Sequence, residues 1–325
     1  MQRRTVTTIA ACLALGALGL NARAQDSWPA KAVRIIIPST PGGGTDFIAR
    51  TLAQKLTEGA GWTIVPENRP GAAGTLGLAE TARARPDGYE LVIGQTANVS
   101  LAPWLMKLNF DPVKDLLPVA MAVEAPMVLL VNENSPHKTW ADFLKAAKAD
   151  PARPLSFATS GTGSTAQVAG EMLQEASGFK LQHVPYKGST PAIADLMGGH
   201  VDLAGTSVAS ALPMLQGGKV RALAVTSGKR SSALPNVPAL SELGYPKLAV
   251  VEWYGVFAPA GTPAAVADRL NAEVNKVLQR EDVRKAILAQ GQEPKPDSRA
   301  AFATMVRADN AMSKDIIAKA GIKLE

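Results

Sequence analysis

Apolar positions along the chain follow two alternating patterns. Short runs typical of strands occur at 33–37, 91–94, 127–131, 155–158, 201–204, 222–226 and 255–258. Helical patterns lie between them, as at 47–56, where Ile48, Leu52 and Leu56 fall on one face, and at 168–173, which Gly178 closes. This alternation predicts an α/β fold with mostly parallel sheets.

Two loops rich in glycine and hydroxyl side chains each join a predicted strand to a predicted helix. Residues 41–46 follow the strand at 33–37, and residues 160–165 follow the strand at 155–158. The first N–H groups of a helix have no internal partner and the helix dipole adds partial positive charge, so such a loop favours an anion. Ligands of open α/β sheets lie beyond the carboxyl ends of strands, where both loops fall. The sequence therefore predicts two anion-binding loops.

The first residues have the pattern of a secretory signal. Arg3 and Arg4 precede an uncharged run at 5–20, and Ala22-Arg23-Ala24 is a small-x-small cleavage site. We expect cleavage before Gln25, which makes residues 1–24 a signal peptide and places the mature protein in the periplasm. A membrane anchor would need about 20 apolar residues. Both the general and the twin-arginine export routes stay open.

Charge and cysteine content narrow the function classes. Loss of the signal removes three arginines and no acid, which lowers the net charge from +6 to +3. The basic residues are scattered and aromatic residues are 5% of the chain, which argues against nucleic-acid binding. Cys12 is the only cysteine and leaves with the signal, so the mature chain has no disulfide.

Three common enzyme motifs are absent from the sequence. No glycine loop ends in the Lys-Ser/Thr pair of a phosphate-binding loop, and Phe47 occupies the last glycine position of a dinucleotide fingerprint. The motif G-x-S-x-G is absent, and the three histidines, His137, His183 and His200, lack metal-ligand spacing. We therefore expect no catalytic residue, metal or cofactor. A secreted hydrolase using Ser164 or Ser160 stays open as the alternative.

Several ordered blocks resemble one family. They are Trp28-Pro29, residues 41–46, Glu67-Asn68-Arg69-Pro70-Gly71, Pro86-Asp87-Gly88-Tyr89, Val184-Pro185-Tyr186-Lys187-Gly188, Leu223-Ala224-Val225-Thr226, Pro235-Asn236-Val237-Pro238, Trp253-Tyr254-Gly255 and residues 258–263. Together they resemble the Bug family, the extracytoplasmic substrate-binding proteins of tripartite tricarboxylate transporters. The resemblance covers essentially the whole mature chain.

The resemblance implies a two-lobed type II periplasmic binding fold that closes on a small carboxylate without chemistry. Lobe 1 would comprise residues 25–126 and 250–325, and lobe 2 residues 127–249, so that the chain crosses the hinge twice. The implied partners are the membrane subunits of a transporter, and the protein is expected to be a monomer. A sensor that presents its closed form to a signalling protein is a further alternative.

Candidate ligand-binding residues follow from the loops and the matching blocks. Thr45 and Ser164 are the preferred contacts, with helix capping as the alternative, and Asp46 either meets the ligand or stabilises the helix start. In lobe 1 the candidates are Ser39, Thr40, Gly43, Gly44, Thr45, Asp46, Gly74, Thr75 and Thr96. In lobe 2 they are Ser160, Gly161, Thr162, Gly163, Ser164, Thr165, Gln167, Tyr186, Lys187 and Thr206.

Three departures from the family pattern concern specificity. Ser39 replaces a frequent aromatic residue, Gln167 replaces a usual histidine, and Gly205-Thr206 replaces a common Phe-Asp pair. The replacements predict a roomier and less acidic pocket. We therefore expect an aromatic or longer-chain carboxylate, such as a longer-chain dicarboxylate, rather than a compact amino acid.

Overall fold

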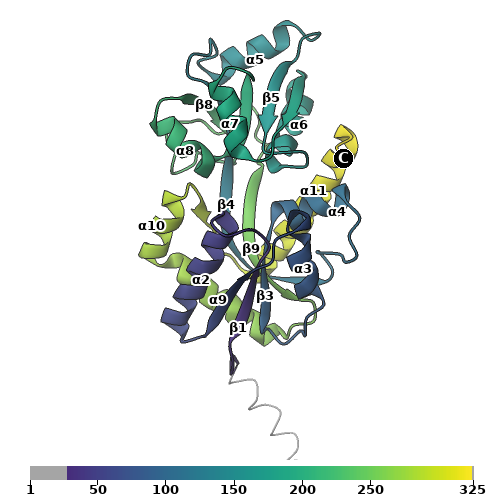
Figure 1. Ribbon diagram of the computed structural model, residues 1–325, viewed down its shortest axis with the longest axis vertical. Helices are drawn as coiled ribbons and strands as arrows, with labels where there is room; N and C mark the ends of the chain where they lie inside the picture. Colours follow the sequence, from purple (N-terminus) through teal and green to yellow (C-terminus); the bar gives the residue numbers. More distant parts are fainter. Residues whose placement is uncertain (1–27, 324–325) are drawn as a thin grey trace, which may run out of the picture.

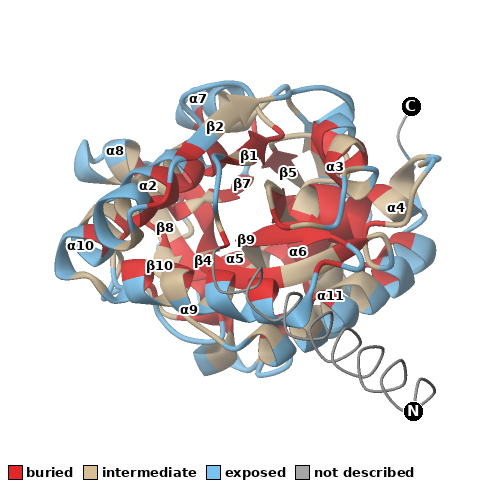
Figure 2. Cartoon of the chain, turned by 90° about the horizontal axis from the view of Figure 1, so that it is seen from below, coloured by how far each residue is buried: buried red, intermediate tan, exposed pale blue. Residues whose placement is uncertain are grey.

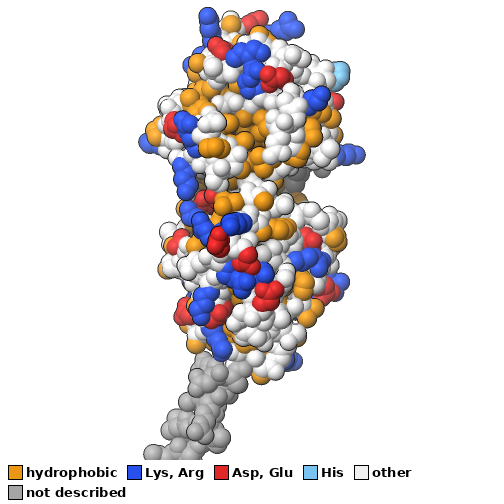
Figure 3. Space-filling view, turned by 90° about the vertical axis from the view of Figure 1, so that its left-hand side faces the viewer, with side chains coloured by type: hydrophobic (Ala, Val, Ile, Leu, Met, Phe, Trp, Pro, Cys, Tyr) orange, Lys and Arg blue, Asp and Glu red, His pale blue; other side chains and the backbone are white. Residues whose placement is uncertain are grey.

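Two long strands connect the two lobes of the computed structural model, in which residues 28–323 are described (Figure 1). β4 (Leu116–Asn132) pairs with β9 (Val251–Pro259) as far as Pro126, and from Met127 onward it pairs with strands of the other lobe. The chain therefore crosses the waist in β4 and returns in β9. Figure 3 shows this waist as a constriction between two larger bodies.

Lobe 1 is built on a sheet with the strand order β2-β1-β3-β9-β4, and β10 pairs with β4. Its further strands are β1 (Val33–Ile37), β2 (Ile64–Asn68), β3 (Glu90–Gln95) and β10 (Glu293–Pro294). One face carries α2 (Gly44–Ala60), α9 (Ala264–Gln279) and α10 (Glu281–Ala289). The other face carries α3 (Thr75–Ala82), η2 (Thr96–Leu101) and α11 (Arg299–Ala320). The short elements η1 (Ala72–Gly74) and α4 (Ala102–Leu105) lie in its loops.

Side chains of β1 show how one strand supplies both cores. Ile35 and Ile37 join the cluster beneath α2 and α9, whereas Ile36 joins the cluster beneath α3 and α11. Successive side chains of a strand point to opposite faces, so an uninterrupted apolar run suits a strand that is covered on both sides. Figure 2 shows the buried residues gathered on the strands and on the inward faces of the helices.

Lobe 2 has the strand order β4-β7-β5-β6, with β8 also paired to β4. Its strands are β5 (Leu155–Thr159), β6 (Leu181–Pro185), β7 (Leu203–Ser207) and β8 (Val220–Val225). One face is covered by α5 (Trp140–Ala149) and α6 (Thr165–Ser177), and the other by α7 (Ser189–Met197) and α8 (Val208–Gln216). A short turn of helix, η3 (Leu240–Leu243), follows β8.

The sheets are mixed, whereas the sequence predicts mostly parallel ones. β1 pairs in parallel with β2 and β3, and β5 pairs in parallel with β6 and β7. Every pairing made by β4 or β9 is antiparallel. The reason is topological: one of these strands carries the chain out of lobe 1 and the other brings it back.

The last helix, α11, forms a further connection between the lobes. Its first half packs in lobe 1 through Phe302 and Val306, next to Trp253 of β9. Its second half places Ile316 and Ile317 in a cluster with Val168 of α6. Lys319 also pairs with Glu175 of α6 at 2.9 Å. The sequence assigns all of residues 250–325 to lobe 1, but the end of α11 contacts lobe 2.

The predicted signal peptide, residues 1–24, lies outside the described residues, and so does its cleavage site before Gln25. Within residues 28–323, no helix combines the length and the hydrophobicity needed to span a bilayer.

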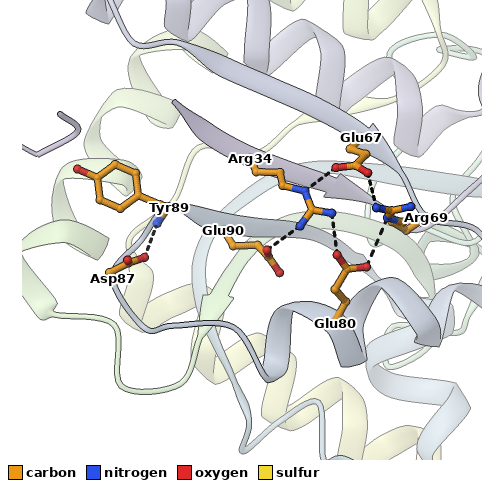
Figure 4. A network of polar contacts seen from close by, with 7 residues as sticks. All are labelled: Arg34, Glu67, Arg69, Glu80, Asp87, Tyr89 and Glu90. Atoms are coloured by element: carbon orange, nitrogen blue, oxygen red, sulfur yellow. Dashed lines mark hydrogen bonds and ion pairs between the residues drawn. The ribbon is translucent and has the colours of Figure 1, made fainter. Parts of the chain in front are cut away.

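One arginine ties together the part of lobe 1 that leads into a predicted ligand loop (Figure 4). The Arg34 guanidinium on β1 binds Glu67 on β2, Glu80 on α3 at 2.7 Å and Glu90 on β3 at 2.8 Å. Arg69 contacts Glu67 and Glu80 from the other side. The hydrogen bond from Arg34 holds the pKa of the Glu67 carboxyl below its usual range. This network ties the end of β2 to the second half of α3, and residues 70–74 turn between these two elements.

Replacing Arg34 tests the network. Arg34→Met leaves three carboxylates facing one another without their shared donor, and we expect a loss of about 1–3 kcal/mol in the free energy of unfolding because the bonds to charged groups are lost. Partial exposure of the side chains keeps this below the cost of breaking a fully buried pair. Thermal unfolding followed by circular dichroism should show a Tm lower by several degrees.

The matched control is Lys285→Met, which breaks the exposed pair of Lys285 with Glu281 on α10. Exposed pairs contribute about 0–1 kcal/mol, so the Tm should hardly move. Equal shifts for the two variants would contradict a special role for Arg34.

Candidate functional site

Helices begin at the carboxyl ends of the parallel strands in both lobes. α2 follows β1, α3 follows β2 through η1, and α6, α7 and α8 follow β5, β6 and β7. Figure 1 shows β1 and β5 running towards the waist from opposite lobes. The positive ends of these helices therefore lie on the sides of the lobes that face the waist.

Three of these helix starts have no side-chain cap. The N-cap residues of α2, α3 and α7 are Gly43, Gly74 and Gly188, which have no side chain to accept from the first turn. α6 and α8 are capped instead by the hydroxyls of Ser164 and Ser207. Uncapped helix starts leave N–H donors for an anion. Donors of this kind come from both lobes.

The side chains of Thr45 and Asp46 hold the first loop in place. The Thr45 hydroxyl donates to Gln95 Oε1 at 2.7 Å. The Asp46 carboxylate accepts from the Gly42 N–H at 3.0 Å and from Arg50 Nε at 2.9 Å, and it also accepts from Asn68. Thr45 and Asp46 are thus engaged within lobe 1, and the loop offers a ligand mainly its backbone N–H groups.

Burial and hydrogen bonding act on the Asp46 carboxyl in opposite directions. Burial raises its pKa, but the hydrogen bonds from Arg50, Gly42 and Asn68 lower it more, so that the net pKa lies below the usual value. The ionised form is therefore the one that stabilises the start of α2.

Two glycines of lobe 1 occupy positions where a side chain would collide. A Cβ on Gly44 would lie 2.9 Å from Gln292 Nε2 and 3.3 Å from the Tyr254 hydroxyl. A Cβ on Gly74 would lie 2.8 Å from Asn98 Nδ2, and its φ of +89° is in any case a conformation that favours glycine. Both glycines let the loop backbone approach neighbouring polar side chains closely.

The other lobe 1 candidates differ in how their polar atoms are used. Thr75 donates to the Ala72 carbonyl at 2.7 Å, and the Thr96 hydroxyl accepts from the Trp253 N–H at 2.9 Å. Ser39 Oγ is buried without a partner among the described residues. Thr40 and Gly43 are exposed on the loop.

The second loop is held by its own backbone and by β6. The Ser164 hydroxyl accepts from the Gln167 N–H, and Gln167 Oε1 accepts from the Gly163 N–H at 2.8 Å. The Ser160 carbonyl accepts from the Gly188 N–H at the start of α7. Ser164 thus caps α6, as the alternative interpretation of this residue proposed. Half-buried Gly161 and Thr162 and buried Thr165 complete the loop.

Tyr186 and Lys187 follow β6 at the same edge of the sheet. The Tyr186 hydroxyl donates to Asp195 Oδ2 at 2.6 Å, and this bond raises the pKa of Tyr186 to about 12. The hydroxyl is therefore engaged within lobe 2. The Lys187 side chain is exposed.

Gly205 and Thr206 in β7 face opposite sides of the sheet. A Cβ on Gly205 would lie 2.8 Å from the ring of Phe157, so the missing side chain is replaced by packed core rather than by pocket space. Thr206 is 1% exposed, and its hydroxyl has no partner among the described residues.

Polar residues of the hinge were missed by the sequence analysis. Tyr254 and Gln292 lie against Gly44, and Glu252 lies two residues before Tyr254 on β9. The spacing of two could have placed Glu252 and Tyr254 on one face of a strand. Nothing in the sequence around Gln292 points to this position.

Comparison with known proteins decides the family. Residues 48–322 match the family described as the tripartite tricarboxylate transporter family receptor. The chain belongs to this family. The predicted resemblance and the two-lobed periplasmic binding fold are thereby confirmed, and the protein is a solute-binding receptor of the periplasmic type.

Three relatives illustrate the similarity to this receptor. BugT of Bordetella pertussis is 36% identical over 274 residues, which are 83% of each chain. A Rhodopseudomonas palustris protein solved with adipate is 32% identical, with a TM-score of 0.77, over 91% of this chain and 100% of the other. MatC of Rhodopseudomonas palustris, solved with bound malate, is 32% identical, with a TM-score of 0.72, over 89% and 100%.

Asp46 gives the receptor a testable pH dependence. Its pKa in the fold lies below the unfolded value, so its contribution to stability is present above the unfolded pKa of about 4 and is lost as the pH falls through the folded pKa. Asp46→Asn should lower the free energy of unfolding by about 1–3 kcal/mol at pH 7. Urea denaturation should show this difference from the wild type shrinking towards pH 2–3.

Asp315→Asn, on an exposed position of α11, is the control and should show no such trend. If the deficit of Asp46→Asn were as large at low pH as at pH 7, the charge of Asp46 would not be its cause.

Proposed function

We propose that the mature receptor captures one small carboxylate between lobe 1 (25–126 and 250–325) and lobe 2 (127–249) and delivers it to the membrane subunits of a tripartite transporter. The observation that carries this proposal is the set of uncapped helix starts at the strand ends of both lobes, at Gly43, Gly74 and Gly188. Export by a signal peptide, with residues 1–24 removed, is part of the proposal.

The binding free energies favour contacts to the ligand from both lobes. A helix terminus contributes about 0.3–2 kcal/mol to an anion, and a hydrogen bond to a charged group about 1.5–3 kcal/mol. Micromolar binding needs about 8 kcal/mol after the costs of ordering are met. One loop falls short of this sum. Donors from α2 and α3 of lobe 1 and from α7 of lobe 2 together reach it, so closure of the lobes becomes part of the affinity.

Two relatives indicate the chemical class and the size range of the ligand. One is solved with adipate and another with malate, both of which carry carboxylates. In this chain Ser39 and Thr206 have small side chains, whose hydroxyls have no partner within residues 28–323. We therefore keep an aromatic or longer-chain carboxylate as the proposed ligand class. Of the three departures from the family pattern that predict it, the one at Gly205 opens no space, because the Phe157 ring packs against Gly205.

Geometry gives no support to a serine hydrolase. Ser164 accepts from the Gln167 N–H as a helix cap. His183 Nε2 bonds to Thr159 Oγ1 at 2.7 Å, and among residues 28–323 no hydrogen bond joins a histidine to Ser160 or Ser164. Incubation with ester and amide substrates should give binding without turnover.

The decisive variant removes one N–H donor from the first loop. Gly44 is the first residue of α2, where proline is well tolerated, so Gly44→Pro deletes a single donor while keeping the helix. Isothermal titration with the tightest ligand from a panel of aliphatic and aromatic carboxylates should show a loss of about ten- to hundredfold relative to Gly44→Ala.

Gly44→Ala is the matched control because it adds the same Cβ beside Gln292 and keeps the N–H. Equal affinities of the two variants would remove this N–H from the binding site. Failure of every carboxylate in the panel to bind the wild type would overturn the proposed function itself.

A further inference from the structure

The two faces of β9 have different surroundings. Val251 and Trp253 line a cavity of about 550 Å³ together with Met121 of β4 and Met305 of α11. Alternate residues of a strand point to opposite sides, so Glu252 and Tyr254 point away from this cavity. The Tyr254 hydroxyl lies beside Gly44, which places this second face of β9 beneath the first ligand loop.

Glu252 lies where the strands pass from one lobe to the other. It pairs in register with Ala125, next to the position where β4 leaves the sheet of lobe 1. The residue is half-buried, and its carboxyl takes part in no ion pair within residues 28–323. Burial raises the pKa of the Glu252 carboxyl, and the Tyr254 hydroxyl beside it offsets only part of this effect. The carboxylate is thus short of donors.

A second glutamate, Glu124 on the adjacent strand β4, makes the contrast clear. Glu124 pairs in register with Trp253 and lines the cavity on the opposite face. It has a cation partner, Lys295, at 3.2 Å. Glu124, on the cavity face of the hinge, thus has a cation partner, whereas Glu252, on the face beneath the first ligand loop, has none within residues 28–323.

Gln292 adds a second acceptor at the same place. The residue is 3% exposed, and its Oε1 has no partner among the described residues. Its Nε2 lies against Gly44. We call Gly44, Glu252, Tyr254 and Gln292 the hinge cluster. It presents acceptor oxygens next to N–H groups that are suited to a carboxylate.

Resting on the proposed function, we propose that Glu252 and Gln292 accept hydrogen bonds from a hydroxyl or ammonium group of the ligand whose carboxylate is held by the loops. Buried acceptors are costly without donors, and a ligand that supplies donors removes this cost. A second carboxylate at the same position would meet a like charge. The hinge cluster therefore selects hydroxy- or aminocarboxylates, and the pocket is more acidic than Gly205 and Thr206 predict from the sequence.

The test uses ligands that differ only at the far end. Unbranched monocarboxylates, ω-hydroxycarboxylates, ω-aminocarboxylates and α,ω-dicarboxylates with chains of three to eight carbons are screened by thermal shift and then titrated calorimetrically against the protein purified after export. The quantity compared is the ratio of the Kd of the dicarboxylate to that of the hydroxy- or aminocarboxylate of the same length.

We expect the wild type to bind the hydroxy- or amino-ligand at least tenfold more tightly than the dicarboxylate. Glu252→Gln should reduce this ratio about ten- to hundredfold, because a neutral amide loses the charge-assisted acceptor and can donate to a second carboxylate. Glu124→Gln, on the other face of the hinge, should leave the ratio unchanged.

Gln292→Met is the second variant and keeps the test decisive if Glu252→Gln unfolds. It should weaken the hydroxy- and amino-ligands relative to the monocarboxylate of the same length. A dicarboxylate that binds the wild type at least as tightly overturns the inference, as does a Glu252→Gln variant that changes all ligand classes by one factor. In both cases the proposed function survives. No binding by any member of the series overturns the inference, and failure of the aromatic carboxylates as well overturns the proposed function.

Discussion

The backbone pairing of β4 with its neighbours is the constraint on which the two-lobed arrangement depends. β4 is bonded to β9 along its first part and to β7 and β8 along its second part, so a single strand belongs to both sheets. Its register with β9 shifts between Pro118 and Ala120 and between Met121 and Val123. Such irregularities increase local twist, and they allow one strand to serve sheets of different orientation. The loops of the two lobes can face each other only because this strand is shared.

The candidate site relies on backbone donors that are placed by side chains rather than on side chains themselves. Thr45, Asp46, Ser164 and Gln167 are all engaged in holding their own loops. Prior engagement of these groups limits the entropy that must be lost when an anion binds, because the donors are already oriented. Differences in ligand preference are then carried by residues away from the loops, such as Glu252 and Gln292.

The sequence predicted most of the peripheral strands, the two glycine loops between strand and helix, and the family, because each depends on a local pattern. It recognised only residues 127–131 of β4, because Pro118, Glu124 and Pro126 interrupt the apolar run. Pro118 lies at a register shift with β9, and Glu124 and Pro126 lie near the point where the strand leaves one sheet for the other. The roles proposed for Glu252 and Gln292 depend on the contacts of Tyr254 and Gln292 with Gly44, which is more than 200 positions away in the sequence, and no local pattern records such a contact. Ser164 shows the converse: its capping role was foreseen as an alternative because N-caps have a local signature.

The end of α11 has a consequence for the way in which the lobes can move. α11 is rooted in lobe 1 by Phe302, yet its last turns touch α6, which starts at the second ligand loop. Lobe 2 is therefore supported at two separate places, the strand pair and this lateral helix contact. A rotation about the line through both supports preserves them, whereas a tilt in another direction would separate Ile316 from Val168 and expose apolar surface to water. Rotation about this one axis therefore costs the least free energy. The direction of the axis is set by α11, a helix that belongs to neither sheet.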